Sequence, residues 1–262
     1  MSIRPPSSTA PPALNAHLLG TVEYAAALAL QQRSVFEAGD RGFVPEGGGG
    51  QRIMLLLSEH EPVITLGRGG SREDVRMSDD ELKSRRVNIV WTNRGGGAWP
   101  HLPGQLAVYP IVPLAELGWT VGEYLRRLQV GLQAALTELN VPTDTRPGSF
   151  GLWGRSGQLI GVGAAVKNWI TYHGAFLNVA PEMNIFRRVV TDRNEKTPAG
   201  SLAQERQGHV PMQTVRSAVV RHLSEAFSCD RYHLHTGHPL LRVGSSLPNR
   251  KRSSRESARR AS

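Results

Sequence analysis

One loop of the sequence carries residue types that can bind and polarise a small ligand. Three consecutive glycines, Gly95, Gly96 and Gly97, stand between Arg94 and His101. Glycines let the backbone approach a ligand closely and expose its N–H groups, while the guanidinium is a fixed charge and the imidazole can titrate. The loop is therefore either a ligand-binding loop or a flexible hairpin with an incidental histidine. It is not a P-loop, because it lacks the Gly-Lys-Ser/Thr ending and a strand follows it.

Two further segments have glycines within apolar runs. Gly161 and Gly163 flank Val162 in a strand-like stretch that lacks the third glycine and the following helix of a dinucleotide site. These glycines make room for a group that crosses the strand, or they mark a β-bulge. His173 precedes Gly174 at the start of another strand, where a single histidine is more often structural than catalytic.

A cluster near the end of the sequence has the composition of a metal site, with Cys229, His233, His235 and His238. The spacing matches none of the common zinc patterns, so we expect no metal there and no cofactor elsewhere. Cys229 is the only cysteine of the sequence. An internal disulfide is therefore impossible, and the reducing cytoplasm is the expected compartment.

The elements that must position these residues follow from the spacing of apolar side chains. The pattern predicts helices over 18–38, 78–85, 120–139 and 210–227, and strands over 53–58, 62–67, 87–91, 105–112, 150–153, 158–166 and 174–179. Strands occur in neighbouring groups with helices between the groups. This order predicts an α+β fold with a mixed, largely antiparallel sheet flanked by helices.

Composition divides the chain into one domain and two tails. Residues 1–16 are rich in Pro, Ser, Thr and Ala, and residues 241–262 are rich in Ser and Arg, so we expect both to be disordered and 17–240 to form the domain. The net charge is +9, but residues 242–262 carry seven basic residues and one acidic residue, which leaves +3 for the rest. That excess does not indicate nucleic-acid binding. No apolar run reaches the roughly 18 residues of a membrane-spanning helix.

Several motifs in a fixed order resemble the lipoyl(octanoyl) transferase family, whose fold is that of biotin and lipoate protein ligases. The resemblance covers about 19–227. Its residues are 19–24 and 27–31, then 55–68, then Arg94-Gly95-Gly96, His101, Pro103-Gly104-Gln105-Leu106 and Tyr109-Pro110, and finally Gly161-Val162-Gly163 and 173–179.

The resemblance implies transfer of an octanoyl group from the thioester of acyl carrier protein to a lysine of a lipoyl domain. The acceptors in such a family are lipoyl domains of 2-oxoacid dehydrogenases or the glycine cleavage H protein. By the same resemblance the acyl group binds at Arg94, Gly95, Gly96, Gly97, Ala98, Trp99, Pro100, His101, Gly161, Val162, Gly163, Gly174, Ala175 and Phe176. Gly-rich backbone beside apolar strands suits a narrow alkyl chain with a polar head.

The two catalytic positions of the family are substituted. Counting from Phe186 or back from Ser201, the family's nucleophilic cysteine falls on Asp192, and its lysine falls on Gln158. Leu102 also replaces the glycine that usually follows His101. Two hypotheses remain from these departures: direct acyl transfer without a covalent intermediate, or an acyl-binding homologue without turnover. An ATP-dependent ligase is a weaker third, because it too relies on a lysine near Gln158.

Overall fold

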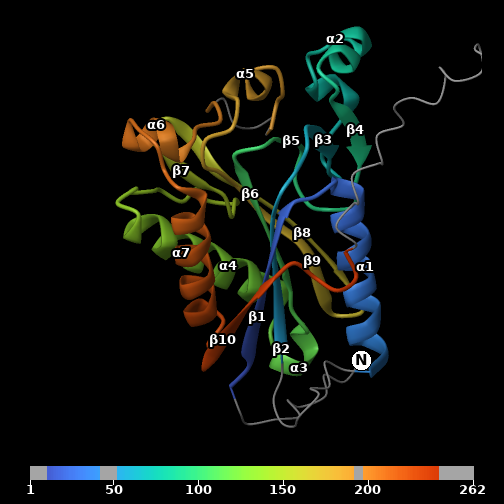
Figure 1. The fold of residues 1–262 in the computed structure, drawn as a ribbon, viewed down its shortest axis with the longest axis vertical. Coiled ribbons are helices and arrows are strands. Elements are labelled where there is room, and N and C mark those ends of the chain that lie inside the picture. Colours follow the sequence, from blue (N-terminus) through green and yellow to red (C-terminus); the bar gives the residue numbers. More distant parts are fainter. Residues whose placement is uncertain (1–10, 42–51, 192–196, 242–262) are drawn as a thin grey trace, which may run out of the picture.

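The computed structural model describes residues 11–41, 52–191 and 197–241, which form two β-sheets and the helices around them (Figure 1). The large sheet has the order β10 (Arg231–Thr236), β1 (Ala13–Thr21), β2 (Arg52–Glu59), β6 (Gln105–Ile111), β9 (Ile170–Asn178), β8 (Gly157–Lys167) and β7 (Leu152–Gly154). The small sheet has the order β4 (Asn88–Trp91), β3 (Val63–Leu66) and β5 (Ala98–His101). The helices are α1 (Tyr24–Arg41), α2 (Asp79–Ser84), α3 (Leu114–Leu117), α4 (Val121–Glu138), α5 (Met183–Phe186), α6 (Leu202–Arg206) and α7 (Met212–Ala226), with a 3-10 turn η1 (Arg72–Asp74).

Strand pairing confirms the predicted fold class. In the large sheet β1 runs parallel to β10 and β2, while β2–β6, β6–β9, β9–β8 and β8–β7 are antiparallel. In the small sheet β3 is parallel to β4 and antiparallel to β5. The sheets are therefore mixed and largely antiparallel, with one crossover through α1.

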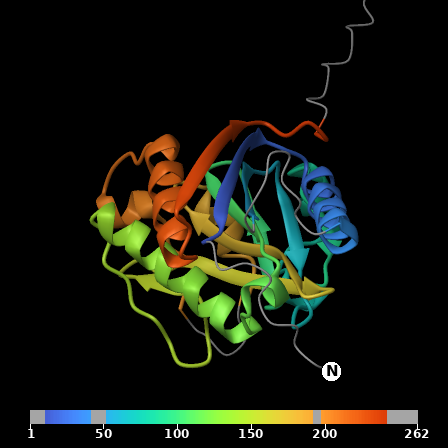
Figure 2. The same ribbon diagram turned by 90° about the horizontal axis from the view of Figure 1, so that it is seen from below.

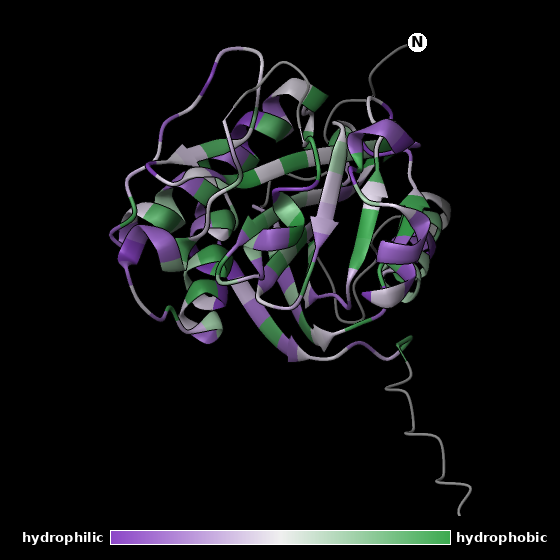
Figure 3. Ribbon diagram, turned by 90° about the horizontal axis from the view of Figure 1, so that it is seen from above, coloured by the Kyte–Doolittle hydropathy of each residue, from purple (hydrophilic) through white to green (hydrophobic). Residues whose placement is uncertain are grey.

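The large sheet has helices on both of its faces (Figure 2), with one cluster of buried apolar residues on the first face and two on the second. On one face α4 and α7 pack against it and against each other, and they approach so closely that a Cβ on Gly131 would lie 2.8 Å from Leu223. On the other face lie α1 and the small sheet. The helices alternate hydrophobic and hydrophilic residues (Figure 3), as expected when one side of each faces a core. The small sheet lies over β8, the strand that carries both Gly161 and Gly163, because Trp99 of β5 contacts Gly161.

The amphipathic helix α4 was predicted almost to the residue. Thr120 caps it by accepting a hydrogen bond from the N–H of Glu123 at 3.1 Å. The prediction of one helix over 18–38 was wrong in its first part, because residues up to Thr21 belong to β1 and α1 begins at Tyr24. Pairing with β2 and β10 on both sides overrides the local spacing.

Strand β1 also changes the boundary of the N-terminal tail. It begins at Ala13, so residues 13–16 lie in the sheet and not in a tail. Residues 1–10 and 242–262 of the two predicted tails lie outside the described residues. In the ranges that the structure does describe, no helix combines the length and apolar character needed to cross a membrane.

The sequence pattern does not predict three of the strands, which are β10, β5 and β1. All six residues of β10 are exposed, so the strand has no buried alternation. Strand β5 lies within the predicted loop 94–105 and all four of its residues are buried, which again gives no alternation. Strand β1 has a clear buried and half-buried alternation only from Ala13 to Ala16.

Candidate functional site

A buried arginine is the centre of the polar contacts between the two sheets. Arg94 is 2% exposed, and its Nε and Nη2 donate to Thr65 Oγ1 at 3.1 and 2.7 Å. Nη2 also donates to the carbonyl of Thr65 at 2.9 Å, and Nη1 donates to the carbonyl of Gly95 at 2.9 Å. The guanidinium lies 5.5 Å from the ring centroid of Phe176. Burial lowers the pKa of Arg94 to about 10, which keeps it charged at neutral pH.

The glycines around Arg94 are explained by its packing. A Cβ on Gly163 would lie 2.5 Å from the carbonyl oxygen of Gly95 and 3.2 Å from Arg94 Nη1. A Cβ on Gly67 would lie 2.8 Å from the same Nη1. The N–H of Gly95 donates to the carbonyl of Ala164 at 2.9 Å, which fixes the loop on β8. Gly163 therefore makes room for the glycine loop, which crosses β8 at this residue.

The second glycine of β8 is covered by an aromatic ring. Trp99, from β5, is 5% exposed, and a Cβ on Gly161 would come within 2.6 Å of its six-membered ring. The ring centroid lies 6.2 Å from that of Phe176 and 6.0 Å from that of Phe186. Gly161 is therefore required for Trp99 to pack against the strand.

His101 is buried, and its two ring nitrogens form hydrogen bonds with residues of both sheets. Thr65 Oγ1 donates to its Nε2 at 2.9 Å, and its Nδ1 donates to Gln105 Oε1 at 3.0 Å. The side-chain Nε2 of Gln105 in turn donates a hydrogen bond to Asn178 Oδ1 at 2.8 Å. Burial, and then the charges of His60 and Arg94, hold the pKa of His101 well below its ordinary value. The imidazole is neutral, and both of its nitrogens are occupied by the protein.

Two more histidines, His60 and His173, are buried and hydrogen-bonded to other parts of the protein. His60 Nδ1 donates to the carbonyl of Val22 at 2.7 Å, and Tyr109 donates to its Nε2 at 2.8 Å. His173 has a left-handed backbone, with φ of 55°, and its N–H donates to Gln31 Oε1 at 2.7 Å. Burial lowers the pKa of His60 to about 4 and that of His173 to about 3. These contacts support the structural interpretation of His173.

The structure brings together some of the residues assigned to acyl binding and separates others. Facing the space between the sheets are Arg94, Trp99, His101, Gly161, Gly163 and Phe176. Val162 and Ala175 pack instead into the core under α4 and α7. Gly174 allows close strand pairing, since a Cβ there would lie 2.2 Å from the carbonyl oxygen of Val108.

Some residues of this centre were not identified from the sequence as site residues. Thr65 lies on β3, Tyr109 lies on β6 and His60 directly follows β2, so their convergence depends on how these strands pair. The signal available in the sequence was Thr65 itself, a polar residue in the otherwise apolar run Val63–Leu66.

The family's nucleophile position, Asp192, lies outside the described residues. The residues before it are anchored at the glycine loop. The N–H of Val190 donates to the carbonyl of Asp74 at 2.8 Å, and a Cβ on Gly97 would lie 2.8 Å from the carbonyl oxygen of Thr191. The chain therefore enters residues 192–196 beside Gly97.

The residues after that segment are anchored at Gln158, the position that the resemblance assigns to the family's lysine. The N–H of Gln158 donates to the carbonyl of Pro198 at 2.9 Å, and the N–H of Gly200 donates to the carbonyl of Gln158 at 2.9 Å. The side chain of Gln158 is neutral, and its Nε2 donates to the carbonyl of Ile160 at 3.2 Å. Among the described residues the lysines are Lys83, exposed on α2, and Lys167, exposed at the opposite end of β8 from Gln158, so neither replaces the ammonium at position 158.

The only thiol of the chain is elsewhere. Cys229 is half-buried against the core under α4 and α7. Burial raises the pKa of its thiol to about 12, so almost none is thiolate at neutral pH. Cys229 is therefore unsuited to serve as a nucleophile.

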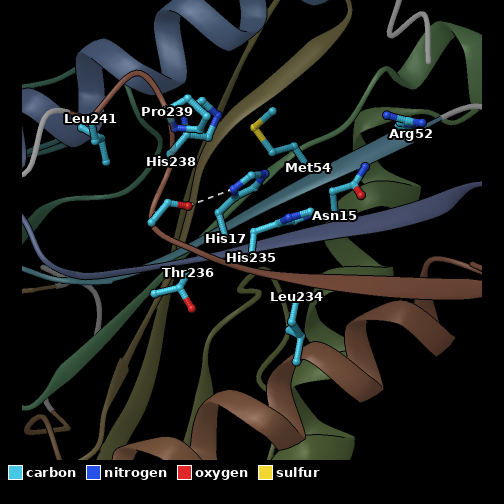
Figure 4. Close-up of a pocket in the computed structure, with 11 residues that line it drawn as sticks. Asn15, His17, Arg52, Met54, Leu234, His235, Thr236, His238, Pro239 and Leu241 are labelled. Carbon is cyan, nitrogen blue, oxygen red and sulfur yellow. Dashed lines mark hydrogen bonds between the residues drawn. The ribbon is translucent and has the colours of Figure 1, made fainter. Parts of the chain in front are cut away.

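Cys229 is separated from the histidines near the end of the described chain with which it shares the composition of a metal site. His235 and His238 line a cavity of about 1030 Å³ over β1, β2 and β10, where each ring lies 4.7 Å from that of His17 (Figure 4). His17 Nδ1 donates to the carbonyl of Gly237 at 3.1 Å, and burial lowers its pKa to about 4. Cys229 does not line this cavity. Within the ranges that the structure describes, no group of three or more His, Cys, Asp or Glu is arranged to hold a metal ion.

The fold and the family comparison place the chain in the lipoyl protein ligase A/B class. Residues 23–224 match the family model of the lipoyl protein ligase A/B catalytic domain. A lipoate-protein ligase A solved with ATP is similar with a TM-score of 0.67 at 14% identity, over 86% of this chain and 90% of that one. A bipartite lipoate protein ligase from Thermoplasma acidophilum has a TM-score of 0.66 at 16% identity, over 86% and 88%. At these identities the solved structures show the fold.

Sequence similarity to curated relatives is more specific. The chain is 36% identical over 201 residues to the octanoyltransferase of Geobacter metallireducens, over 77% of this chain and 87% of the relative. It is 37% identical over 204 residues to the octanoyltransferase of Syntrophotalea carbinolica, over 78% and 90%. The chain belongs to the octanoyltransferase family within the lipoyl protein ligase A/B class.

Proposed function

We propose that this protein transfers a medium-chain acyl group, octanoyl in the first instance, from the thioester of acyl carrier protein to a lysine of a lipoyl domain in the cytoplasm. The observation that supports the proposal is the anchoring of Thr191 at Gly97 and of residues 198–200 at Gln158. On this basis we propose that positions 158 and 192, which the resemblance assigns to the family's lysine and cysteine, form one site.

The proposed step is direct aminolysis without an acyl-enzyme. The lysine amine attacks the thioester carbonyl, the C–N bond forms, the C–S bond breaks, and the phosphopantetheine thiol leaves with the proton that the amine releases. Asp192 orients the incoming amine, takes up its proton and passes that proton to the departing thiolate, so the carboxylate is regenerated. A carboxylate is a weak base toward an ammonium near neutral pH, so the expected rate is lower than that of a thiol enzyme.

A second candidate is an acyl-binding homologue without turnover. Two observations favour it. Gln158 supplies no charge, because its neutral amide donates to the carbonyl of Ile160, and Trp99 covers the strand at Gly161. Under this alternative the carrier protein binds and the acyl group stays on its thioester.

Intact-mass measurement separates the two. The full chain is incubated with octanoyl-loaded carrier protein, with and without a lipoyl domain, and a lipoyl domain whose acceptor lysine is replaced by arginine is the control. An octanoyl group on the acceptor alone supports direct transfer. An adduct on this chain contradicts it, and a complex with no transfer supports the binding homologue.

A further inference from the structure

The two edges of the large sheet differ in how they are closed. At one edge a loop covers β7, because the backbone N–H groups of Asp144 and Trp153 each donate to the other residue's carbonyl, at 2.8 and 3.0 Å. At the other edge β10 pairs with β1 alone among the described residues, and all six of its residues are exposed (Figure 2). The outer row of backbone N–H and C=O groups on β10 is therefore open to another strand.

Strand β10 also presents apolar side chains on the face of the sheet that α7 covers. Its register pairs Ala16 with Leu234, so these side chains share a face, and Tyr232 lies on the same face two residues earlier. Ala16 is fully buried in the core under α4 and α7, whereas Tyr232 is 45% exposed and Leu234 is 56% exposed. Figure 4 shows Leu234 on the α7 side of β10 and His235 on the other side. The apolar row of the core thus continues onto β10, where it is left half in solvent.

This open edge is complementary to its own copy. Arg231, at the start of β10, is its one formal charge, so the strand has no charge pattern that would select an acidic or a basic partner. When two copies run antiparallel about a twofold axis at Leu234, that leucine faces its own symmetry mate and Tyr232 faces Thr236 of the second copy. The same register leaves Arg231 outside the paired residues, so no like formal charges face each other.

We propose that the protein forms a twofold dimer through β10, in which two seven-stranded sheets join edge to edge. Tyr232 and Leu234 of both copies then cover one another on the α7 face. On the opposite face, His233 lies across from His235 of the second copy. Because two six-residue strands bury less area than a stable interface needs, we expect a dissociation constant on the order of 10 µM.

Sedimentation velocity on the full chain, without substrate, measures the association at concentrations below and above that value. Leu234→Lys places two ammonium groups opposite each other at the twofold axis, and Val130→Lys is the matched control on an apolar residue of α4 that is 54% exposed. Wild type and Val130→Lys are expected to rise from the mass of one chain to that of two. Leu234→Lys should weaken the association about tenfold or more, with a thermal melt like that of wild type.

Disulfide trapping tests the register in a Cys229→Ala background, which removes the only native thiol. Leu234→Cys should yield a covalent dimer under copper–phenanthroline oxidation, whereas Tyr232→Cys, which faces Thr236, should yield far less. The proposal is overturned if wild type stays a single chain at every concentration, if Leu234→Lys dimerises as well as wild type, or if the two cysteine variants are trapped equally. Self-association does not depend on the proposed function, so an inactive protein that dimerises through β10 would contradict only acyl transfer.

Discussion

The hydroxyl of Thr65 accepts two hydrogen bonds from Arg94, at 3.1 Å from Nε and 2.7 Å from Nη2. The same hydroxyl donates to His101 at 2.9 Å, so one oxygen joins the buried cation to the imidazole. Thr65→Val keeps the shape and removes this oxygen. Because a charged donor then loses its acceptor, we expect the free energy of unfolding to fall by about 2–3 kcal/mol.

Urea denaturation measures that loss, with Thr137→Val as the control. Thr137 is exposed on α4, and its hydroxyl donates to a carbonyl of its own helix. The control change should stay within about 0.5 kcal/mol. Equal effects at the two positions would show that the Thr65 hydroxyl has no special role.

Gly163→Ala tests whether the loop is seated on β8. The added Cβ would lie 2.5 Å from the carbonyl oxygen of Gly95, a backbone atom that cannot rotate away. We expect a loss of about 1–3 kcal/mol in urea unfolding from the forced shift. Gly122→Ala is the opposite control, since its nearest atom is 4.0 Å away in helix α4, and it should stabilise by about 0.5–1 kcal/mol. A neutral Gly163→Ala would contradict the close contact.

Cys229→Ala should leave acyl transfer unchanged, because the thiol is half-buried away from the glycine loop and burial raises its pKa to about 12. Iodoacetamide labelling of native protein should be slow and should accelerate in urea, with mass spectrometry as the readout. Since the chain has one cysteine, all labelling reports this residue. Loss of transfer in a folded Cys229→Ala protein would assign the thiol a catalytic role.

The buried histidines predict that stability falls in mild acid. Burial holds the pKa of His60 at about 4 and that of His173 at about 3, against about 6.5 in an unfolded chain. As pH falls below 6.5 the unfolded state takes up protons first, so the free energy of unfolding decreases until the folded-state pKa is reached. Each histidine contributes up to about 1.4 kcal/mol per pH unit in that window.

Urea titrations at about pH 7 and pH 5.5 measure this slope, and His60→Gln should make it shallower by about 1 kcal/mol over the interval. His209→Gln, at an exposed position, is the control and should keep the wild-type slope. A slope that His60→Gln does not change would mean that His60 takes up a proton in the folded protein as readily as in the unfolded chain, contrary to its burial and its contacts with Val22 and Tyr109.

The parts of the fold that the sequence predicted are those with local causes. Helix α4 has a capping threonine at Thr120 and apolar residues at helical spacing, so its ends and its buried face both follow from neighbours in the chain. Strand β1 depends on pairing with β2 and β10, which are distant in sequence. The apolar residues of β1 after Leu18 continue the helical spacing of α1, but pairing with β2 makes this segment a strand.

The candidate site likewise has local features that the sequence indicates and long-range contacts that it does not. Residue types alone singled out the glycine loop and its flanking Arg94, as either a ligand-binding loop or a flexible hairpin, and the structure shows that the N–H of Gly95 fixes this loop on β8. The partners of Arg94 were not identified in this way, since Thr65 reaches it only through the pairing of β3 and β5. Trp99 was assigned to ligand binding from its place in the loop, and its contact with Gly161 depends on how the small sheet lies on the large one.

Restoring the two substituted residues gives the strongest test of how the reaction differs from that of the thiol enzymes. In Asp192→Cys with Gln158→Lys, the lysine replaces a neutral amide on β8, the strand to which residues 198–200 are anchored. An ammonium beside a thiol favours the thiolate, which is the attacking form. We therefore expect the double variant to form an octanoyl adduct on this chain when it meets octanoyl carrier protein, and to transfer it to a lipoyl domain faster than wild type.

Intact mass before and after hydroxylamine identifies the adduct as a thioester, and the two single variants are the controls. Asp192→Cys alone should form less adduct, because Gln158 leaves the thiol pKa near its ordinary value, and Gln158→Lys alone should form none. A double variant that binds octanoyl carrier yet forms no adduct would show that positions 158 and 192 do not share one site. That result would remove the basis for placing acyl transfer between the glycine loop and β8.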